Sequence, residues 1–468
     1  MTGTTQDAAR LPRLRFLDTV LYGIVMMVGL RWLPVAAAVG PAAIPMWVLA
    51  FFVFYIPLSV AAAELTSQFP GEGGLYTWVR ETYGPLAGFL CSWFYWISLL
   101  PYFAGILYFL SGLFLSAIGA DMHDKTLYLL VSLGIACFVT AFQFLGLRGS
   151  KWLTNFGATG NWLIFFGIVA VAIVFFAGGE SASHFGSANY LPPADFNTAI
   201  LWGTIIFAIC GAETLAFLQD EIAGGVRTIV RVLGIVGVGT ALIYIAGTVA
   251  MLVILPQADL TRLAGLPDVL HAAFAHAGAP GLAAVAIGFF ALAQMGGFTA
   301  WFGVGTRVTV AVSADRFLPS MFARRHPKTG APGPAIMLMG VLTLLMVVLS
   351  QAGAGAAAAY DFLVSMSVLT VTIPYVFVFA AYLKRVRAEP VPGAWVPPGG
   401  VRLRLLIGVV GQAATLVAIA CTMVPNGSDA HPLETFLKIV LSTLAAAAVG
   451  LIFYTLGNRR RVAVAAAE

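Results

Sequence analysis

The stretch "GIVMMVGLRWLP", residues 23–34, interrupts an apolar run that extends from residue 16 to residue 40. Its two glycines and Pro34 weaken a helix, because glycine costs backbone entropy and proline removes a hydrogen-bond donor. Arg31 adds a charge that costs at least roughly 2.5 to 3.5 kcal/mol at the centre of a membrane span. The stretch therefore predicts a broken membrane helix in which Arg31 has a specific partner.

The composition is typical of an integral membrane protein. Of 468 residues, 60% are hydrophobic and only 10% are charged, and the mean hydropathy is +0.93. Such a chain cannot present a polar surface to water. About twelve apolar stretches are each near the roughly 20 residues that a bilayer requires. They are residues 16–40, 43–64, 86–120, 126–147, 152–179, 196–212, 232–258, 277–306, 335–360, 362–383, 405–428 and 439–458.

The positive charges predict how the chain crosses the membrane. Of the 25 lysines and arginines, twenty fall in loops on one side and three on the other, and Arg31 and Arg307 lie within spans. Because positive loops remain in the cytoplasm, both termini are predicted to be cytoplasmic, in the inner or plasma membrane. The predicted parts are a cytoplasmic tail at 1–15, a transport core at 16–385, a proline-rich linker at 386–401, two last spans at 402–457 and a cytoplasmic tail at 458–468.

A second stretch, "FAICGAETLAF" at residues 207–217, interrupts the sixth span with Gly211 beside Glu213. Broken segments at matching places in two halves are typical of inverted-repeat transporters with a site at the midplane. Five spans in each half, at about 16–177 and 196–385, force the halves into opposite orientations. We therefore predict an all-α membrane protein of about twelve helices, with two inverted five-helix repeats, broken first and sixth helices and two peripheral helices.

The two breaks predict a site that binds and releases a ligand. Unwound backbone exposes N–H and C=O groups that apolar surroundings cannot satisfy, and a zwitterionic ligand can satisfy them. Half-helix N-termini suit a carboxylate, and freed carbonyls suit an ammonium group or a cation. The sequence has no nucleotide-binding loop, metal-ligand spacing or nucleophile elbow. We therefore predict no enzyme activity, no cofactor, no metal and no nucleic acid partner.

Several segments resemble the amino acid, polyamine and organocation transporter superfamily. Residues 29–34 match its first-span pattern, in which Met27 replaces the first glycine. The segments "EGGLYTWV" and "VPPGG" are most similar to the glutamate/γ-aminobutyrate exchanger branch. The longer matches are "AAAELTSQFPGEGGLYTWVRETYGPLAGF" at 61–89, "CGAETLAFLQDEIAGGVRTI" at 210–229 and "GTRVTVAVSADRFLPSMFARRHPKTGAPGPA" at 305–335.

The resemblance implies that the substrate binds at the two breaks. Met27 to Leu30 would form the unwound part of the first span and lend backbone groups to the carboxylate and amine of the substrate. The predicted substrate-binding residues are Met26, Met27, Val28, Gly29, Leu30, Arg31, Phe207, Cys210, Gly211 and Ala212.

The resemblance also implies gating and coupling roles. Phe207 falls where relatives have a gating aromatic, and Glu213 matches a proton-responsive gate. Tyr95 and Trp301 match aromatic residues that line or close the pocket. Asn161 falls where some proton-coupled relatives carry a lysine in place of a sodium ion, and this departure favours exchange.

Two further charged positions have alternative interpretations. Arg31 either binds a substrate carboxylate or controls its access, or it forms a fixed pair with Glu213, or it extends outward to the membrane surface. Glu64, with Arg80 and Glu81, is interpreted as a charge cluster at the cytoplasmic end of the second span or as a solvated helix end.

We predict a secondary active transporter of amino acids or amines derived from them, working by alternating access and favouring exchange. The alternative within the superfamily is proton-coupled uptake. A membrane sensor or channel is the alternative from another class, but a channel would need a continuous polar lining and a sensor a signalling domain. The substrate and the oligomeric state are left open by these patterns.

Overall fold

The computed structural model describes residues 14–465 apart from 71–73, 122–123, 194–195, 262, 315–316, 328, 351–355, 390 and 424–431. Most of the predicted N-terminal tail, residues 1–13, and the last three residues of the C-terminal tail lie outside the described part. The described residues form helices and turns without a β-strand. The structure is therefore all-α, as predicted.

The first five spans and their connections come from the first eight α-helices. Their bounds are α1 Phe16–Met27, α2 Trp32–Ala37, η2 Gly40–Ala42, α3 Ala43–Ala50, the π-helical turn η3 Phe51–Tyr55, α4 Ile56–Gln68, α5 Gly74–Tyr83, α6 Pro85–Ala117, α7 Lys125–Gln143 and α8 Gly146–Ala177. The first span is α1 with α2, the second runs from α3 to α4, and α6, α7 and α8 are the third to fifth spans. The short helix α5 connects the second span to the third.

The remaining spans follow the same plan. Their bounds are η4 Ser187–Tyr190, α9 Phe196–Ala208, η5 Ala212–Glu221, α10 Gly225–Ile254, η6 Gln257–Asp259, α11 Gly265–His276, α12 Gly281–Ala314, η7 Ser320–Ala323, α13 Gly333–Ser350, α14 Ala356–Val386, α15 Gly400–Thr422 and α16 Pro432–Ala465. The sixth span is α9 with η5, and α10, α12, α13, α14, α15 and α16 are the seventh to twelfth. The short helix α11 connects the seventh span to the eighth, as α5 connects the second span to the third.

The number of spans agrees with the prediction. In the described part of the chain, 11 helical segments are long and apolar enough to cross a membrane, and α1 is a further, shorter apolar helix. One boundary was predicted wrongly: the ninth span was expected at 335–360 and the tenth at 362–383. Instead α13 ends at Ser350, and Asp361 lies inside α14. The charged side chain of Asp361 does not interrupt the backbone hydrogen bonds of the helix, so this residue does not mark the end of a span.

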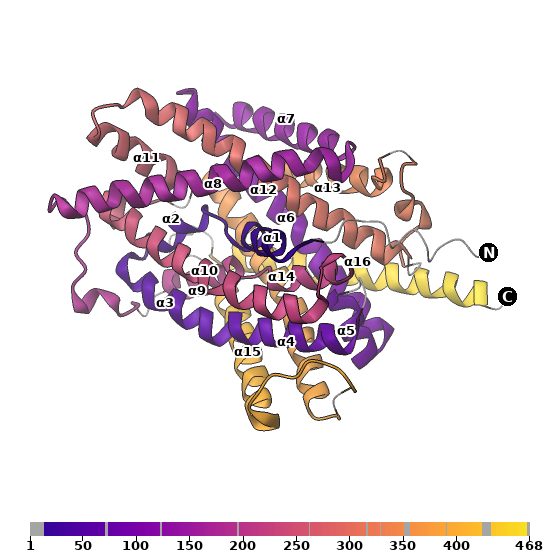
Figure 1. Cartoon of the computed structure of the whole chain (residues 1–468). Coiled ribbons are helices and arrows are strands. Elements are labelled where there is room, and N and C mark those ends of the chain that lie inside the picture. The colour runs from indigo at the N-terminus through magenta and orange to yellow at the C-terminus, as the bar shows by residue number, and fades with distance from the viewer. Residues whose placement is uncertain are drawn as a thin grey trace.

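The contacts between spans repeat when five is added to each span number. The third span α6 packs on the tenth, α14, as the eighth span α12 packs on the fifth, α8. The first span packs on the seventh, α10, as the sixth span packs on the second, through α9 on α3 and η5 on α4. This correspondence is the arrangement expected of two five-helix repeats, and Figure 1 shows α1 near the centre of the resulting bundle.

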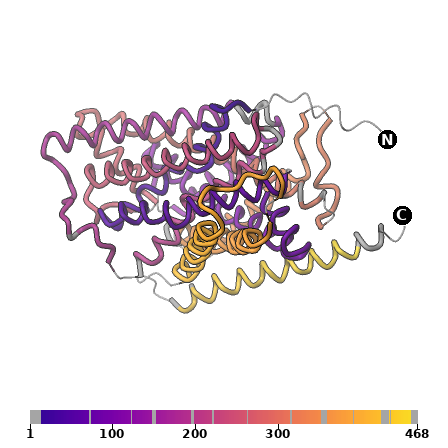
Figure 2. Tube along the Cα trace, turned by 60° about the horizontal axis from the view of Figure 1, so that its bottom comes forward, coloured from indigo at the N-terminus to yellow at the C-terminus, as the bar shows by residue number. Residues whose placement is uncertain are grey.

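The last two spans have no counterpart in this correspondence of contacts. The eleventh span, α15, packs on α9, α14, η3 and α4, whereas the twelfth, α16, packs on α6 and α14. Figure 2 shows α16 in yellow along the outer side of the molecule. Only 11% of its most apolar segment is buried within the protein, so most of this helix is available to lipid.

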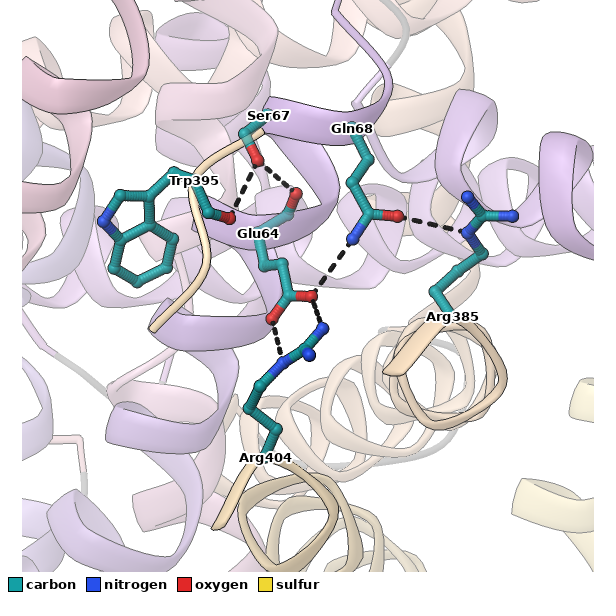
Figure 3. A network of polar contacts seen from close by, with 6 residues as sticks. All are labelled: Glu64, Ser67, Gln68, Arg385, Trp395 and Arg404. Carbon is teal, nitrogen blue, oxygen red and sulfur yellow. Dashed lines mark hydrogen bonds and ion pairs between the residues drawn. The ribbon is translucent and has the colours of Figure 1, made fainter. Parts of the chain in front are cut away.

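A buried ion pair fastens α15 to α4 (Figure 3). Glu64 is completely buried and Arg404 is 3% exposed. The Arg404 Nε donates to Glu64 Oε2 at 3.1 Å, and its Nη2 donates to Oε1. Gln68 Nε2 donates to the same Oε1 at 3.0 Å, and Arg385 Nε donates to Gln68 Oε1 at 3.1 Å. These contacts satisfy both carboxylate oxygens and join α4, α14 and α15.

Both interpretations of Glu64, as part of a charge cluster with Arg80 and Glu81 and as a solvated helix end, were therefore wrong. Arg80 and Glu81 pair with each other at 2.9 Å, and their side chains are 33% and 44% exposed. Glu64 is paired with an arginine 340 positions along the chain. No local pattern in the sequence connects these two residues.

We expect Glu64→Gln to lower the free energy of unfolding by about 3 to 5 kcal/mol, because it leaves the Arg404 guanidinium buried without a counter-charge. Chemical or thermal unfolding in mild detergent measures this loss. Combining Glu64→Gln with Arg404→Met should recover part of it, and Glu81→Gln, which breaks the exposed pair, should cost about 1 kcal/mol or less. A Glu64 variant no less stable than the Glu81 variant would contradict the assignment.

Candidate functional site

A cavity lies where the two broken spans meet. Within the first span, α1 ends at Met27 and α2 begins at Trp32, and within the sixth span α9 ends at Ala208 and η5 begins at Ala212. Because α1 contacts η5 and α2 contacts α9, the two spans run side by side in opposite directions. Side chains from both breaks and from α6, α8, α12 and α14 line this cavity.

The sixth span approaches the first so closely because residue 211 is glycine. Gly211 has φ +119°, a conformation that other residues rarely adopt. A Cβ atom at this position would lie 3.1 Å from the carbonyl oxygen of Met26 and 3.3 Å from the Met27 side chain. The glycine therefore allows both the turn and the contact between the breaks.

The hydroxyl group of Tyr244, on α10, connects the two breaks. It accepts a hydrogen bond from the Gly29 N–H at 3.1 Å and is within donating distance of two carbonyl oxygens, Met27 at 2.8 Å and Ala208 at 2.9 Å. The ring of Tyr244 is completely buried and stacks on Trp47, with 4.4 Å between centroids. The hydroxyl has one proton and donates to one of these carbonyls at a time, so one side chain offers a hydrogen-bond partner at both breaks.

The guanidinium of Arg31 lies between two aromatic rings on the cavity wall. Its Cζ is 4.1 Å from the ring centroid of Trp32 and 4.6 Å from that of Tyr102, which is a cation–π arrangement on both sides. The residue is only 4% exposed, and its Nη1 is buried without a hydrogen-bond partner among the described residues. The predicted outward extension of Arg31 to the membrane surface is therefore absent.

The aromatic residues around Arg31 form a continuous layer across four spans. Phe207 contacts Trp32 edge-on at 5.4 Å and Tyr102 at 5.6 Å, and Tyr102 contacts Trp301 at 5.5 Å. The layer Trp32–Phe207–Tyr102–Trp301 therefore joins the broken first and sixth spans to α6 and α12. Such a layer can close the cavity on one side.

Glu213 is held by three hydrogen bonds at a different part of the cavity. Its Oε1 accepts from the hydroxyl groups of Tyr375 at 2.7 Å and Tyr95 at 3.2 Å, and its Oε2 accepts from the Gly211 N–H at 3.1 Å. The residue is 1% exposed. Over the described residues, Glu213 makes no ion pair with Arg31, so the structure does not contain the fixed pair that the sequence left open.

Most of the predicted site residues line this one cavity. Leu30 and Ala212 are buried in packing, and Gly211 shapes the break without lining the cavity. Those that line it are Met26, Met27, Val28, Gly29, Arg31, Tyr95, Asn161, Phe207, Cys210, Glu213 and Trp301.

Sequence reasoning missed several residues that matter to the geometry. Tyr102, Tyr375 and Gln294 line the cavity, and Tyr244 connects the breaks beneath it. The three tyrosines belong to long spans rich in aromatic or small residues, where one more tyrosine is the expected packing residue. A signal exists only for Tyr102, which follows Tyr95 by two helical turns on α6 and so shares its face.

The fold and the site together define a multi-pass membrane carrier with a central cavity at two broken helices. The family model for amino acid permeases matches residues 14–445, and the chain belongs to this family. Members of the family are transporters rather than enzymes, and this protein is accordingly a membrane transporter.

Three relatives illustrate the range of the family. The chain is 24% identical over 420 residues to an uncharacterized transporter of Legionella pneumophila, covering 88% of this chain and 89% of that protein. It is 23% identical to a glutamate/gamma-aminobutyrate antiporter of Lactococcus lactis, covering 87% and 83%, respectively. It is also 23% identical to a probable agmatine/putrescine antiporter of Lactococcus lactis, covering 67% of each chain.

We expect Tyr244→Phe to lower the free energy of unfolding by about 1 to 3 kcal/mol, because buried backbone groups at both breaks lose their partner. Unfolding in detergent measures the change. Tyr128→Phe is the matched control, since the Tyr128 hydroxyl is buried and has no hydrogen-bond partner in the described part of the chain. Equal losses in the two variants would show that the Tyr244 hydroxyl does not support the breaks.

Proposed function

We propose that the protein exchanges amino acids, or amines derived from them, across the inner or plasma membrane by alternating access. Both termini would lie in the cytoplasm, as the twenty-to-three distribution of lysines and arginines in the loops favours. Substrate would bind in the cavity between the broken spans, and no chemical step on it is required.

The observation that carries this proposal is the cavity itself, which brings both breaks, a buried arginine and a buried glutamate together. A site that contains both charges suits small molecules with charged groups at fixed separations. The names of two relatives support exchange as the mode, because both are antiporters of amino compounds.

Two sets of contacts could alternately close the cavity. The aromatic layer includes Tyr102, and the hydrogen bonds to Glu213 include Tyr95, seven positions earlier on the same helix. At 1.5 Å per residue, the two sets are about 10 Å apart along α6. With the predicted orientation, α6 begins at the cytoplasmic side, so the Glu213 contacts would form the inner closure and the aromatic layer the outer one.

Alternating access then follows from differences between the two closures. The broken first and sixth spans are joined by Tyr244, so they would move together relative to α6 and α12. Opening inward would separate Glu213 from Tyr95, and opening outward would separate Phe207 from Tyr102. In an exchanger, bound substrate lowers the barrier between these states, whereas the empty cavity changes state slowly.

We expect counterflow in proteoliposomes. Vesicles loaded with an unlabelled amino acid or amine should accumulate the labelled compound without an ion gradient, and the uptake should saturate with concentration. Phe207→Ala should reduce the rate of exchange, because it removes the ring that joins Trp32 to Tyr102. Absence of saturable flux for every amino compound tested would rule out the proposed function.

Proton-coupled uptake is the second candidate, and the buried Glu213 carboxylate in the cavity favours it. If Glu213 carries the proton, Glu213→Gln should abolish the stimulation of uptake by an inward pH gradient and leave gradient-free counterflow in place. Glu180→Gln is the control, because this carboxylate is 57% exposed and pairs with His276 away from the cavity. Wild-type uptake that does not respond to the gradient would exclude this candidate.

A further inference from the structure

The geometry points to a substrate that carries a carboxylate, bound chiefly by the side chain of Arg31. This inference rests on the proposed function and narrows it, from amino acids or amines to amino acids. It makes Arg31 the residue that determines substrate charge.

One nitrogen of the Arg31 guanidinium, Nη1, has no hydrogen-bond partner among the described residues. A guanidinium has five N–H donors in a fixed fork and cannot lose its charge in a protein. The rings of Trp32 and Tyr102 lie against the guanidinium, but an aromatic face does not accept the in-plane hydrogen bonds that the N–H groups of the guanidinium can make. Nη1 is buried without a partner in the described chain, and the residue lines the cavity. A carboxylate in the cavity would supply both the missing acceptor and the counter-charge.

Part of the backbone at the first break is already hydrogen-bonded within the protein. The Gly29 N–H and the Met27 carbonyl are both hydrogen-bonded to the Tyr244 hydroxyl. The Val28 N–H donates to the carbonyl oxygen of Ile24 at 2.8 Å. A carboxylate would have to displace Tyr244 to use Gly29, whereas Arg31 offers its donor without displacing a partner. Among the Val28, Gly29 and Leu30 N–H groups, that of Leu30 alone lacks a hydrogen-bond partner in the described part of the chain, so it would add one donor to those of the Arg31 side chain.

The cavity also contains acceptors for the positively charged end of a substrate. A diamine needs two acceptors, and the carboxylate oxygens of Glu213 already accept three hydrogen bonds from protein groups. The amide oxygen of Asn161 lines the cavity and is buried without a partner in the described structure. One free acceptor and one free cationic donor match a molecule with one ammonium and one carboxylate. A dication would also be repelled by Arg31 at short range.

The two named relatives carry substrates that differ in this respect. Glutamate and γ-aminobutyrate both have a carboxylate, and agmatine and putrescine have none. The charges of this cavity agree with the first pair. The same property would apply to both directions of exchange, because each substrate would occupy the same site.

The test is counterflow and its competition by matched compounds in proteoliposomes containing the full chain. Arginine and agmatine differ by one carboxylate, and γ-aminobutyrate and putrescine are of similar length but differ in the group at one end. For the wild type we expect the carboxylate-bearing member of each pair to compete at concentrations about tenfold to a hundredfold lower than its amine.

Three variants give the assignment a second readout. Arg31→Met removes the charge, and we expect it to weaken carboxylate compounds by about tenfold or more while amines are unchanged or improved. Arg31→Lys keeps the charge without the fork and should fall between. Arg307→Met is the matched control, because it removes an arginine from α12 that does not line the cavity. Stabilisation of the detergent-solubilised protein against heating by each compound measures binding in any variant that does not transport.

The possible results separate the two levels of the argument. Preference for amines in the wild type, or an Arg31→Met variant whose acid-to-amine ratio is unchanged, would overturn this inference and leave the transporter assignment intact. If Arg31→Met does not fold, the wild-type ratios and Arg31→Lys decide the question. Absence of saturable flux and of thermal stabilisation for all four compounds would instead overturn the proposed function.

Discussion

The arrangement of the transport core depends on one constraint, which is that backbone polar groups inside a membrane need partners. Two helices of this protein stop and restart at mid-depth, and each break leaves such groups without an intrahelical bond. The Tyr244 hydroxyl offers a partner at both breaks, because it lies within hydrogen-bond distance of the Gly29 N–H and of the Met27 and Ala208 carbonyl oxygens. A third helix, α10, thus contacts the backbone of both breaks.

This arrangement limits which groups of the cavity can bind a substrate. Where backbone groups are free, any ligand with suitable donors and acceptors can bind, and charge matters less than shape. In the described part of the chain, the cavity-lining side chains with a buried atom that lacks a hydrogen-bond partner are Arg31 and Asn161, so recognition in the proposed site would depend on the sign of the substrate charge. The aromatic rings beside Arg31 also exclude water, which strengthens the electrostatic contact that remains.

The sequence predicted the elements of this fold well and their long-range partners poorly. Glycine beside a charge in an apolar run identified both breaks, because few other patterns interrupt a membrane span. The predicted site residues could be expected to face one cavity, and eleven of them line it, eight from the two breaks and three from α6, α8 and α12. The partners of these residues come from helices hundreds of positions away. Nothing near Glu64 indicated Arg404, and nothing near Gly29 indicated Tyr244, because packing between helices is not recorded in local spacing.

The attachment of the last two helices has a consequence for the membrane around the protein. Helix α15 is fastened to α4 by the Glu64–Arg404 pair, whereas α16 packs on α6. If α4 and α15 move together with the broken helices during transport while α6 and α16 stay still, α15 and α16 would shift relative to each other in every cycle. The outline that the protein presents to the acyl chains would then differ between its two states. Bilayer thickness and lateral pressure would then affect the free-energy difference between the two states, although they act on the lipid-facing surface and not on the substrate site.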